Sequence, residues 1–362
     1  MKTSIANSVA MTSLMALACT TAQAQSVTLY GRVDMAIAYQ TRLFSTPTSG
    51  VVIDGHRYLV DSGGSNGSRW GVRGNEDLGG GLKALFVAES GLQADTGVIG
   101  QGGRAFGRQV YVGLEGGFGR LTIGRQYTPW FDVLSTSDPF GNNLVGNSGN
   151  VEHANPRADN AIVYGTPNFG GFTAQGMVAL GERNGSNKAG MQTNLALKYQ
   201  NGPLWVGAAH ARQNNANEVP AGSGNFSTDA TAKFSILGAS YDFGVVKLFG
   251  NVATMTDMNP TIQPAPTVVA GAKGSSWLVG ASAPVVGGTA ILSVVSLDDK
   301  RVQDRDARMW SAGYTYPLSK RTMLYTAYAR MINRNGGTLT VNTPSYPGFG
   351  EAQFQAGVSH AF

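Results

Sequence analysis

The sequence lacks residues on which several common kinds of protein site depend. Its one cysteine is Cys19, near the N-terminus, so the rest of the chain forms no disulfide and offers no thiolate to a metal. The formal charge of +5 is spread singly along the chain without a basic block, so nucleic acid is not an expected partner. No run of about 18 apolar residues is present, which excludes a membrane-spanning helix. No zinc site is expected, because the histidines show no ligand spacing. They are His56, His153, His210 and His360.

Charged residues are also scarce, whereas glycine is abundant. Only 14% of the residues are charged, and 50 of 362 are glycine, a composition unusual for a soluble enzyme. Hydrophobic residues make up 42%, which is too many for a disordered chain. The mean hydropathy of −0.10 remains compatible with membrane strands that are apolar on one face only.

The N-terminal segment has the features of an export signal. Lys2 supplies a positive start, residues 9–18 form a weak apolar stretch, and Ala22-Gln23-Ala24 fits a cleavage site. We therefore expect residues 1–24 to be removed and residues 25–362 to form a single domain. Cys19 lies within the removed segment.

Alternation with a period of two is the main structural signal. In residues 27–39 one parity is apolar and the other polar, and residues 194–199 and 246–252 alternate in the same way. A soluble sandwich would show the same pattern with its apolar face turned inward. The last residues alternate up to Phe362, as expected for a final strand that pairs with the first.

The connections between these segments distinguish the two folds. Seven tight turns alternate with eight longer polar stretches, which together join sixteen strands. Only a closed sheet leaves no backbone polar group facing lipid, and such a sheet sorts short turns to one side and long loops to the other. The sequence thus predicts an all-β fold, a 16-stranded antiparallel transmembrane β-barrel. The turns are expected at 79–81, 116–118, 168–171, 201–203, 242–244, 287–288 and 317–320, and the loops at 40–66, 93–104, 128–156, 183–190, 214–231, 258–274, 298–306 and 333–349.

Two glycine-rich motifs could suggest an enzyme. Residues 63–67 fit the G-x-S-x-G nucleophile pattern, but no buried strand precedes them and no helix follows. Residues 100–105 fit a loose dinucleotide fingerprint without a βαβ unit around it. We expect no enzymatic activity, no cofactor and no metal.

Several stretches resemble the Gram-negative general porins, particularly the neisserial and Burkholderia type. They are residues 27–34 (VTLYGRVD), 68–79 (SRWGVRGNEDLG), 108–114 (RQVYVGL), 121–129 (LTIGRQYTP) and 157–164 (RADNAIVY), with the terminal HAF at 360–362. The resemblance implies a sixteen-stranded barrel in the outer membrane, a homotrimer, and a third extracellular loop folded into the lumen.

The family narrows its pore between basic residues on the wall and acidic residues on this inward loop. Carried over by motif, the basic wall comprises Arg32, Arg69, Arg125 and Arg157. Strand parity agrees for Arg32 and Arg69 and adds Arg73. Arg125 shares the parity of the apolar residues of its segment, so a bulge or strand end must intervene if it faces the pore. The loop of residues 129–156 corresponds to the constriction loop, with Asp138 as the expected acidic tip and Asp132 and Glu152 as further acidic candidates.

The function that follows is passive diffusion of small hydrophilic solutes and ions through a water-filled channel, with a weak preference for anions. A plugged barrel that serves as a surface adhesin or structural antigen is the alternative. The expected partners are two further copies of the chain, outer-membrane lipid and lipopolysaccharide, and the barrel assembly machinery through Phe362.

Overall fold

The computed structural model describes residues 26–44, 52–152, 156–216, 230–258, 268–342 and 350–362. The predicted export signal, residues 1–24, lies outside these residues. Among the residues described, no helix combines the length and the apolar character needed to cross a membrane.

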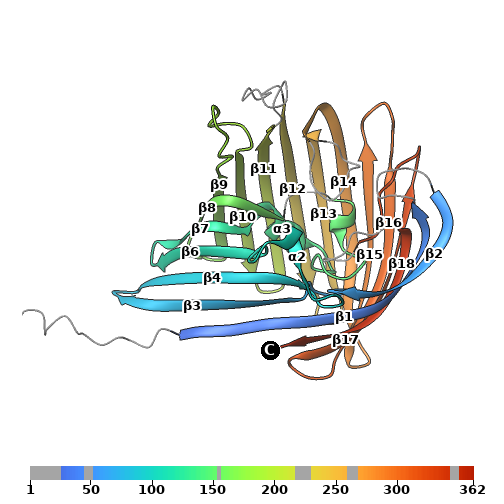
Figure 1. Cartoon of the computed structure of the whole chain (residues 1–362), viewed down its shortest axis with the longest axis horizontal. Coiled ribbons are helices and arrows are strands. Elements are labelled where there is room, and N and C mark those ends of the chain that lie inside the picture. The colour runs from blue at the N-terminus through green and yellow to red at the C-terminus, as the bar shows by residue number, and fades with distance from the viewer. Residues whose placement is uncertain (1–25, 45–51, 153–155, 217–229, 259–267, 343–349) are drawn as a thin grey trace, which may run out of the picture.

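Antiparallel strands make up most of the described chain (Figure 1). They are β1 (Ser26–Phe44), β2 (Val52–Ser62), β3 (Arg69–Gly79), β4 (Leu82–Gln93), β5 (Val98–Ile99), β6 (Gln109–Gly116), β7 (Gly119–Tyr127), β8 (Arg157–Gly165), β9 (Phe172–Ala179), β10 (Gln192–Asn201), β11 (Leu204–Asn214), β12 (Thr231–Asp242), β13 (Lys247–Met258), β14 (Val268–Val285), β15 (Gly288–Asp299), β16 (Ala307–Pro317), β17 (Thr322–Asn333) and β18 (Gly350–Ala361). The helical elements are α2 (Gly100–Gly103), α3 (Pro129–Ser137) and the 3₁₀ turn η2 (Ser148–Asn150).

The strands close into a ring of sixteen, as predicted. β2 and β3 both pair with the same edge of β1, β2 along its second half and β3 along its first, so together they occupy one place in the ring. β5 pairs only with the end of β4, outside the ring. The other edge of β1 pairs with β18, where Arg32 lies opposite Ala361 and Leu43 opposite Gly350. This seam leaves the sheet without a free edge, and it confirms that the last strand pairs with the first.

All seven predicted turns lie between paired strands. The loops predicted for residues 40–66 and 258–274 were wrong in extent, because β1 continues to Phe44, β2 begins at Val52 and β14 begins at Val268. Cross-strand aromatic contacts stabilise this extension, with the Tyr39 and Tyr58 rings 4.9 Å apart. Residues 63–68, which contain the G-x-S-x-G motif, separate β2 from β3 and interrupt the pairing along this edge of β1. They are fixed by Asp34, which accepts hydrogen bonds from the backbone amides of Ser65 and Asn66.

The two faces of the sheet differ as the alternation predicted. On β1 the apolar residues Leu29 and Ile37 are 62% and 69% exposed on the outside, whereas Asp34 is buried. On β10 Leu195 and Leu197 are exposed and Asn194 is buried. The outer face is therefore apolar, as a barrel in lipid requires, and on these two strands the inner face carries the polar residues. On β12–β17 the inner face is instead mostly small and apolar, with Phe234 and Met309 buried.

The segment between β7 and β8 begins with a short amphipathic helix. Thr128 caps α3 by accepting a hydrogen bond from the amide of Phe131, Pro129 occupies the first turn, and Asp132 lies near the positive end of the helix. Its apolar side chains are buried, and the helix contacts β9–β13. The contacting helix residues are Trp130, Val133 and Leu134.

Glycines on the inner face of the far wall make room for this segment. A Cβ atom built at Gly238 of β12 would lie 2.5 Å from Cβ of Ser137. At Gly280 of β14 it would lie 2.6 Å from Cγ of Pro139, and at Gly313 of β16 it would lie 2.8 Å from Cε1 of Phe140. The segment therefore follows a groove that depends on the missing side chains of these glycines.

Filling that groove should displace the segment. We expect Gly313→Leu to push Phe140 away, because overpacking at a close contact costs about 1–3 kcal/mol. The rate at which a thiol reagent modifies a Val145→Cys probe measures the displacement, since Val145 is fully buried and residues 25–362 contain no cysteine. The rate should rise in the Gly313→Leu background. Ala312→Leu, the neighbouring substitution on the exposed face, should leave it unchanged, and equal rates in both backgrounds would refute the groove.

Candidate functional site

Arginines from neighbouring strands form a continuous chain of contacts on the inner wall. The Nε atom of Arg69 on β3 lies 3.5 Å from Oε2 of Glu89 on β4. Nε of Arg108, just before β6, lies 2.8 Å from Oε1 of the same carboxylate, and its Nη2 donates to the Tyr127 hydroxyl. Nη2 of Arg157 on β8 donates to that hydroxyl too, at 2.6 Å. One carboxylate and one phenol thus hold three guanidinium groups close together.

Arg32 extends this chain to β1. It lies opposite Arg69 in the register, and its Nη1 donates to the Ser359 hydroxyl at 2.8 Å. We call Arg32, Arg69, Arg108 and Arg157 the arginine ladder. Three of its members were predicted from the sequence, whereas Arg108 and its partner Glu89 were not.

Arg73 lies apart from the ladder. It faces inward two alternate positions along β3 from Arg69, towards the turn at residues 79–81, and its Cζ lies 5.1 Å from the centre of the Tyr30 ring. It lines a pocket of about 390 Å³ together with Lys83 and Arg120. Arg73 therefore adds positive charge nearer the short-turn end of the barrel.

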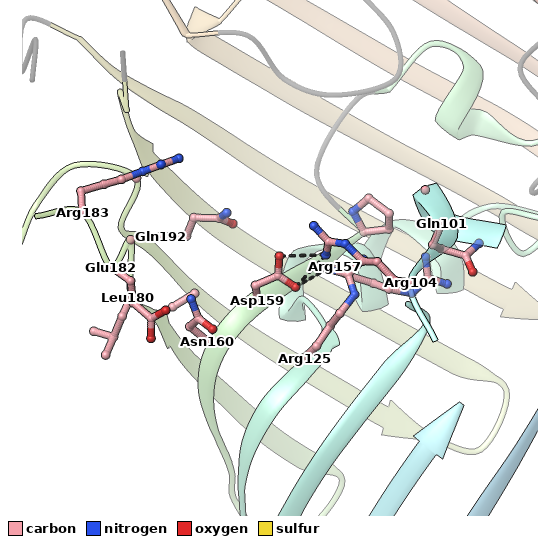
Figure 2. Close-up of a pocket in the computed structure, with 15 residues that line it drawn as sticks. Gln101, Arg104, Arg125, Arg157, Asp159, Asn160, Leu180, Glu182, Arg183 and Gln192 are labelled. Carbon is pink, nitrogen blue, oxygen red and sulfur yellow. Dashed lines mark hydrogen bonds and ion pairs between the residues drawn. The ribbon is translucent and has the colours of Figure 1, made fainter. Parts of the chain in front are cut away.

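Arg125 occupies an irregular part of the wall, which is the condition that its parity set for an Arg125 side chain facing the pore. The register between β7 and β8 shifts between Gly124 and Gln126. Nη1 of Arg125 lies 2.6 Å from Oδ1 of Asp159, which also binds Arg104 at 2.9 Å, and its Nε donates to the Gly107 carbonyl. Figure 2 shows Arg125 and Arg104 directed towards Asp159, with Arg157 beside them.

This group lines a pocket of about 840 Å³ at the loop ends of β7 to β10. Arg183 and Glu182 lie on the opposite side of the pocket in Figure 2. The pocket continues the positive surface from the ladder towards the long loops, because four arginines and two carboxylates line it. They are Arg104, Arg125, Arg157, Arg183, Asp159 and Glu182.

The segment between β7 and β8, residues 128–156, is called the inward segment below. The three acids predicted on it lie in different surroundings. Asp132 is 43% exposed in its side chain and forms an ion pair with Lys198 of β10. Asp138, expected as the acidic tip, is 2% exposed and accepts hydrogen bonds from the amides of Phe140, Asn142 and Ser148. Its carboxylate organises the backbone of the segment and is turned away from water.

Glu152 is equally buried, at 1% exposed, against the far wall. It accepts hydrogen bonds from Asn251 of β13 and Ser276 of β14. Burial raises the pKa of the Glu152 carboxyl from 4.5 to about 7, and Asp138 nearby adds to the effect. Burial likewise raises the pKa of Asp138 to about 6. Two of the three predicted acids therefore fasten the segment to itself and to the wall.

The tip of the segment also reaches the wall near β1. The amide of Leu144 donates to the carbonyl of Ser65 in the 63–68 insertion, at 3.1 Å. Asn147 and Asn150 exchange hydrogen bonds with the backbone of Asn342. The segment is thus attached on both sides of the ring, and residues 63–68 serve as one of its anchors.

Comparison with known proteins extends the resemblance seen in the sequence. The profile of a family described as Gram-negative porin matches residues 10–336. An outer membrane porin protein of Bordetella pertussis is 35% identical over 353 residues, which cover 85% of this chain and 90% of that protein. Outer membrane porin protein 32 of Delftia acidovorans is 34% identical over 358 residues, which cover 93% and 94%.

A solved structure shows the same architecture. The anion-selective porin from Comamonas acidovorans superposes with a TM-score of 0.74 at 32% identity. The match covers 93% of this chain and 100% of that one.

The buried carboxyl of Glu152 should make the attachment of the inward segment depend on pH. A raised pKa means that the folded state favours the protonated acid, so its stabilising contribution is complete below pH 4.5 and is lost as the pH rises to about 7. Hydrogen exchange of the amides in residues 138–152 should therefore accelerate between pH 4.5 and 7, after correction for the intrinsic rate. Glu152→Gln should reduce this change, whereas Asp132→Asn should retain it. An unchanged pH profile in the glutamine variant would contradict the assignment.

Proposed function

The chain belongs to the Gram-negative porin family, and on that premise we propose that its arginine ladder and inward segment form a constriction that favours anions. The protein is an outer-membrane porin, a closed β-barrel through which small hydrophilic solutes diffuse passively. Which residues set its selectivity is the part we infer from the arrangement of charges.

The excess of cations over accessible carboxylates carries this proposal. The ladder has four arginines and one carboxylate, Glu89, which contacts Arg69 and Arg108. On the inward segment Asp138 and Glu152 are buried, and Asp132 is paired with Lys198. Fixed charges that line a narrow opening set the ion preference of a channel. The described part of this wall therefore presents a net positive potential to an entering solute.

The comparison with a solved structure also supports a preference for anions. The solved relative that shares 32% of its residues with this chain is described as anion-selective. We propose a weak preference of the same sign here, because salt screens charges in a water-filled opening and limits their discrimination.

The alternative of a plugged barrel predicts almost no conductance. The relatives are porins, which are channel proteins, and the G-x-S-x-G motif at residues 63–67 is engaged in anchoring the inward segment. We therefore favour an open channel without enzymatic activity, and conductance of the purified protein in a planar bilayer tests this choice.

We further propose that residues 1–24 are a cleaved export signal and that three copies assemble in the membrane. The barrel assembly machinery would recognise the C-terminal strand, whose Phe362 is 48% exposed. The amide of Phe362 donates to the Gly31 carbonyl and the amide of Gly31 donates to the Phe362 carbonyl, at 3.1 Å each. The residue that would be recognised therefore also completes the seam.

Neutralising one ladder arginine should move the selectivity towards cations. A unit charge in water changes the energy of an ion at 4–8 Å by roughly 0.5–1 kcal/mol. Arg69→Gln should therefore lower the anion-to-cation permeability ratio about two- to fivefold, measured as the reversal potential in a salt gradient. Arg69 is suited to this test because Glu89 keeps Arg108 as a partner.

Removing a negative charge from the ladder should shift the reversal potential in the opposite direction. Glu89→Gln should raise the anion preference, since it removes the carboxylate of the ladder. Arg321→Gln, at an exposed position just before β17, should leave the reversal potential unchanged. Equal reversal potentials for the Arg69 and Glu89 variants would exclude the ladder from the constriction.

A further inference from the structure

A pocket of about 390 Å³ opens between α3 and the inner face of β6 to β9. Its lining runs along β7 from Tyr127, which is opposite Arg157 in the register, to Arg120, which is opposite Gly165 next to a short turn. The pocket therefore lies on the short-turn side of the arginine ladder, where a solute that has passed the ladder meets it next. Small-molecule sites typically have volumes of about 300–1,000 Å³. We call this space the side pocket, and its lining includes Gln109, Arg120, Tyr127, Phe131, Ser135 and Gln175.

One side of the side pocket is a flat aromatic platform. The rings of Tyr127 and Phe131 are stacked, with their centroids 5.2 Å apart and their planes 9° from parallel. The Tyr127 hydroxyl is held by hydrogen bonds from Arg108 and Arg157. Phe131 is held by α3, because its amide donates to the capping hydroxyl of Thr128. The platform is thus fixed before a solute arrives, which lowers the entropic cost of binding.

Neutral polar side chains line the pocket beside this platform. Ser135 follows Phe131 by one turn of α3, so both side chains are on the same side of the helix. Gln109 of β6 and Gln175 of β9 contribute carboxamides, and Tyr111 of β6 contributes a hydroxyl. Amide and hydroxyl groups both donate and accept hydrogen bonds, so they match the hydroxyl groups of a neutral solute.

The charges at the side pocket are matched, in contrast to those of the ladder. Among the described residues that line it, Arg120 and Asp132 are the charged ones. Nε of Arg120 lies 3.7 Å from Oε2 of Glu115, and Asp132 forms an ion pair with Lys198. A carboxylate solute would need an unmatched cation, whereas a hydroxyl group can donate to one member of an ion pair and accept from the other. The pocket therefore favours a neutral solute over an anion.

We propose that the side pocket binds a neutral pyranose sugar on its way through the channel. The C–H groups of such a sugar form a flat apolar face that can lie on the electron-rich face of an aromatic ring, and its hydroxyl groups project from the edge. The aromatic platform and the surrounding amides and hydroxyls match these two features. This inference rests on the proposed open channel, and it adds a class of uncharged solute to the anions that the ladder favours.

A sugar that binds inside the channel should reduce its ion current. The purified protein is inserted into a planar bilayer, and the current is recorded while glucose or mannitol is added. Mannitol is an open-chain relative of glucose that carries hydroxyl groups but has no ring, so it reports the effect of viscosity. Glucose should lower the current more than mannitol does, and its additional effect should saturate.

Removing the flat ring of the platform should weaken this effect. Phe131→Leu keeps an apolar side chain on α3, and the loss of one aromatic contact lowers affinity about three- to tenfold. The glucose concentration that gives half of the maximal effect should rise by this factor, while the conductance without sugar stays the same. Phe249→Leu is the matched control, because Phe249 of β13 also packs partly buried against the inner core and does not line the pocket.

Other results would overturn the proposal. A normal conductance with equal effects of glucose and mannitol would refute the sugar site and leave the open channel intact. A conductance near zero would overturn the proposed function, and this inference with it. A stronger reduction by benzoate than by glucose would replace the sugar with an aromatic acid, and an equal shift in the Phe131 and Phe249 variants would exclude the platform.

Discussion

The need to pair every backbone amide and carbonyl within lipid governs the rest of this structure. The chain meets it by joining β18 to β1, with Phe362 completing the seam against Gly31. Once the sheet is closed, each strand has one face towards lipid and one towards the lumen, so every charge that cannot tolerate hydrocarbon must point inward or lie at a rim. The arginine ladder, which lies on the inner face, is one result of this constraint.

The inner face is divided into two unlike halves. The wall from β1 to β8 carries the ladder, in which Arg69, Arg108 and Arg157 share Glu89 and the Tyr127 hydroxyl. The wall from β10 to β17 is lined by small and apolar residues, including Gly238 and Gly313, and the inward segment packs on it. An apolar inner wall would be a poor surface for a water-filled channel, and the segment covers it. Its own buried acids, Asp138 and Glu152, then fasten it in place instead of facing the solute.

Much of the fold could be predicted from the sequence because strand parity and turn chemistry are local. Leu195 and Asn194 alternate as a barrel requires, and every tight turn contains a glycine or a proline. Even the irregularity near Arg125 was visible as a charge on the apolar parity. The extent of β1 and β2 could not be predicted, because residues 40–66 are polar enough to resemble a loop. Pairing with neighbouring strands holds most of them in strands.

The site was harder to predict, because parity indicates a face of the sheet but neither the depth along the barrel nor what covers the position. Arg73 has the correct parity and lies away from the ladder. Arg108 precedes its strand and therefore has no parity to interpret, although Glu89 brings it beside Arg69. Asp138 and Glu152 are on the expected segment, and only the packing of that segment shows that their carboxylates are buried. Long-range contacts of this kind are set by the closed ring, which brings β3, β7 and β8 together from distant parts of the chain. A basic wall can consequently be recognised from local sequence, whereas the acids that oppose it can be identified only after the inward segment has been placed.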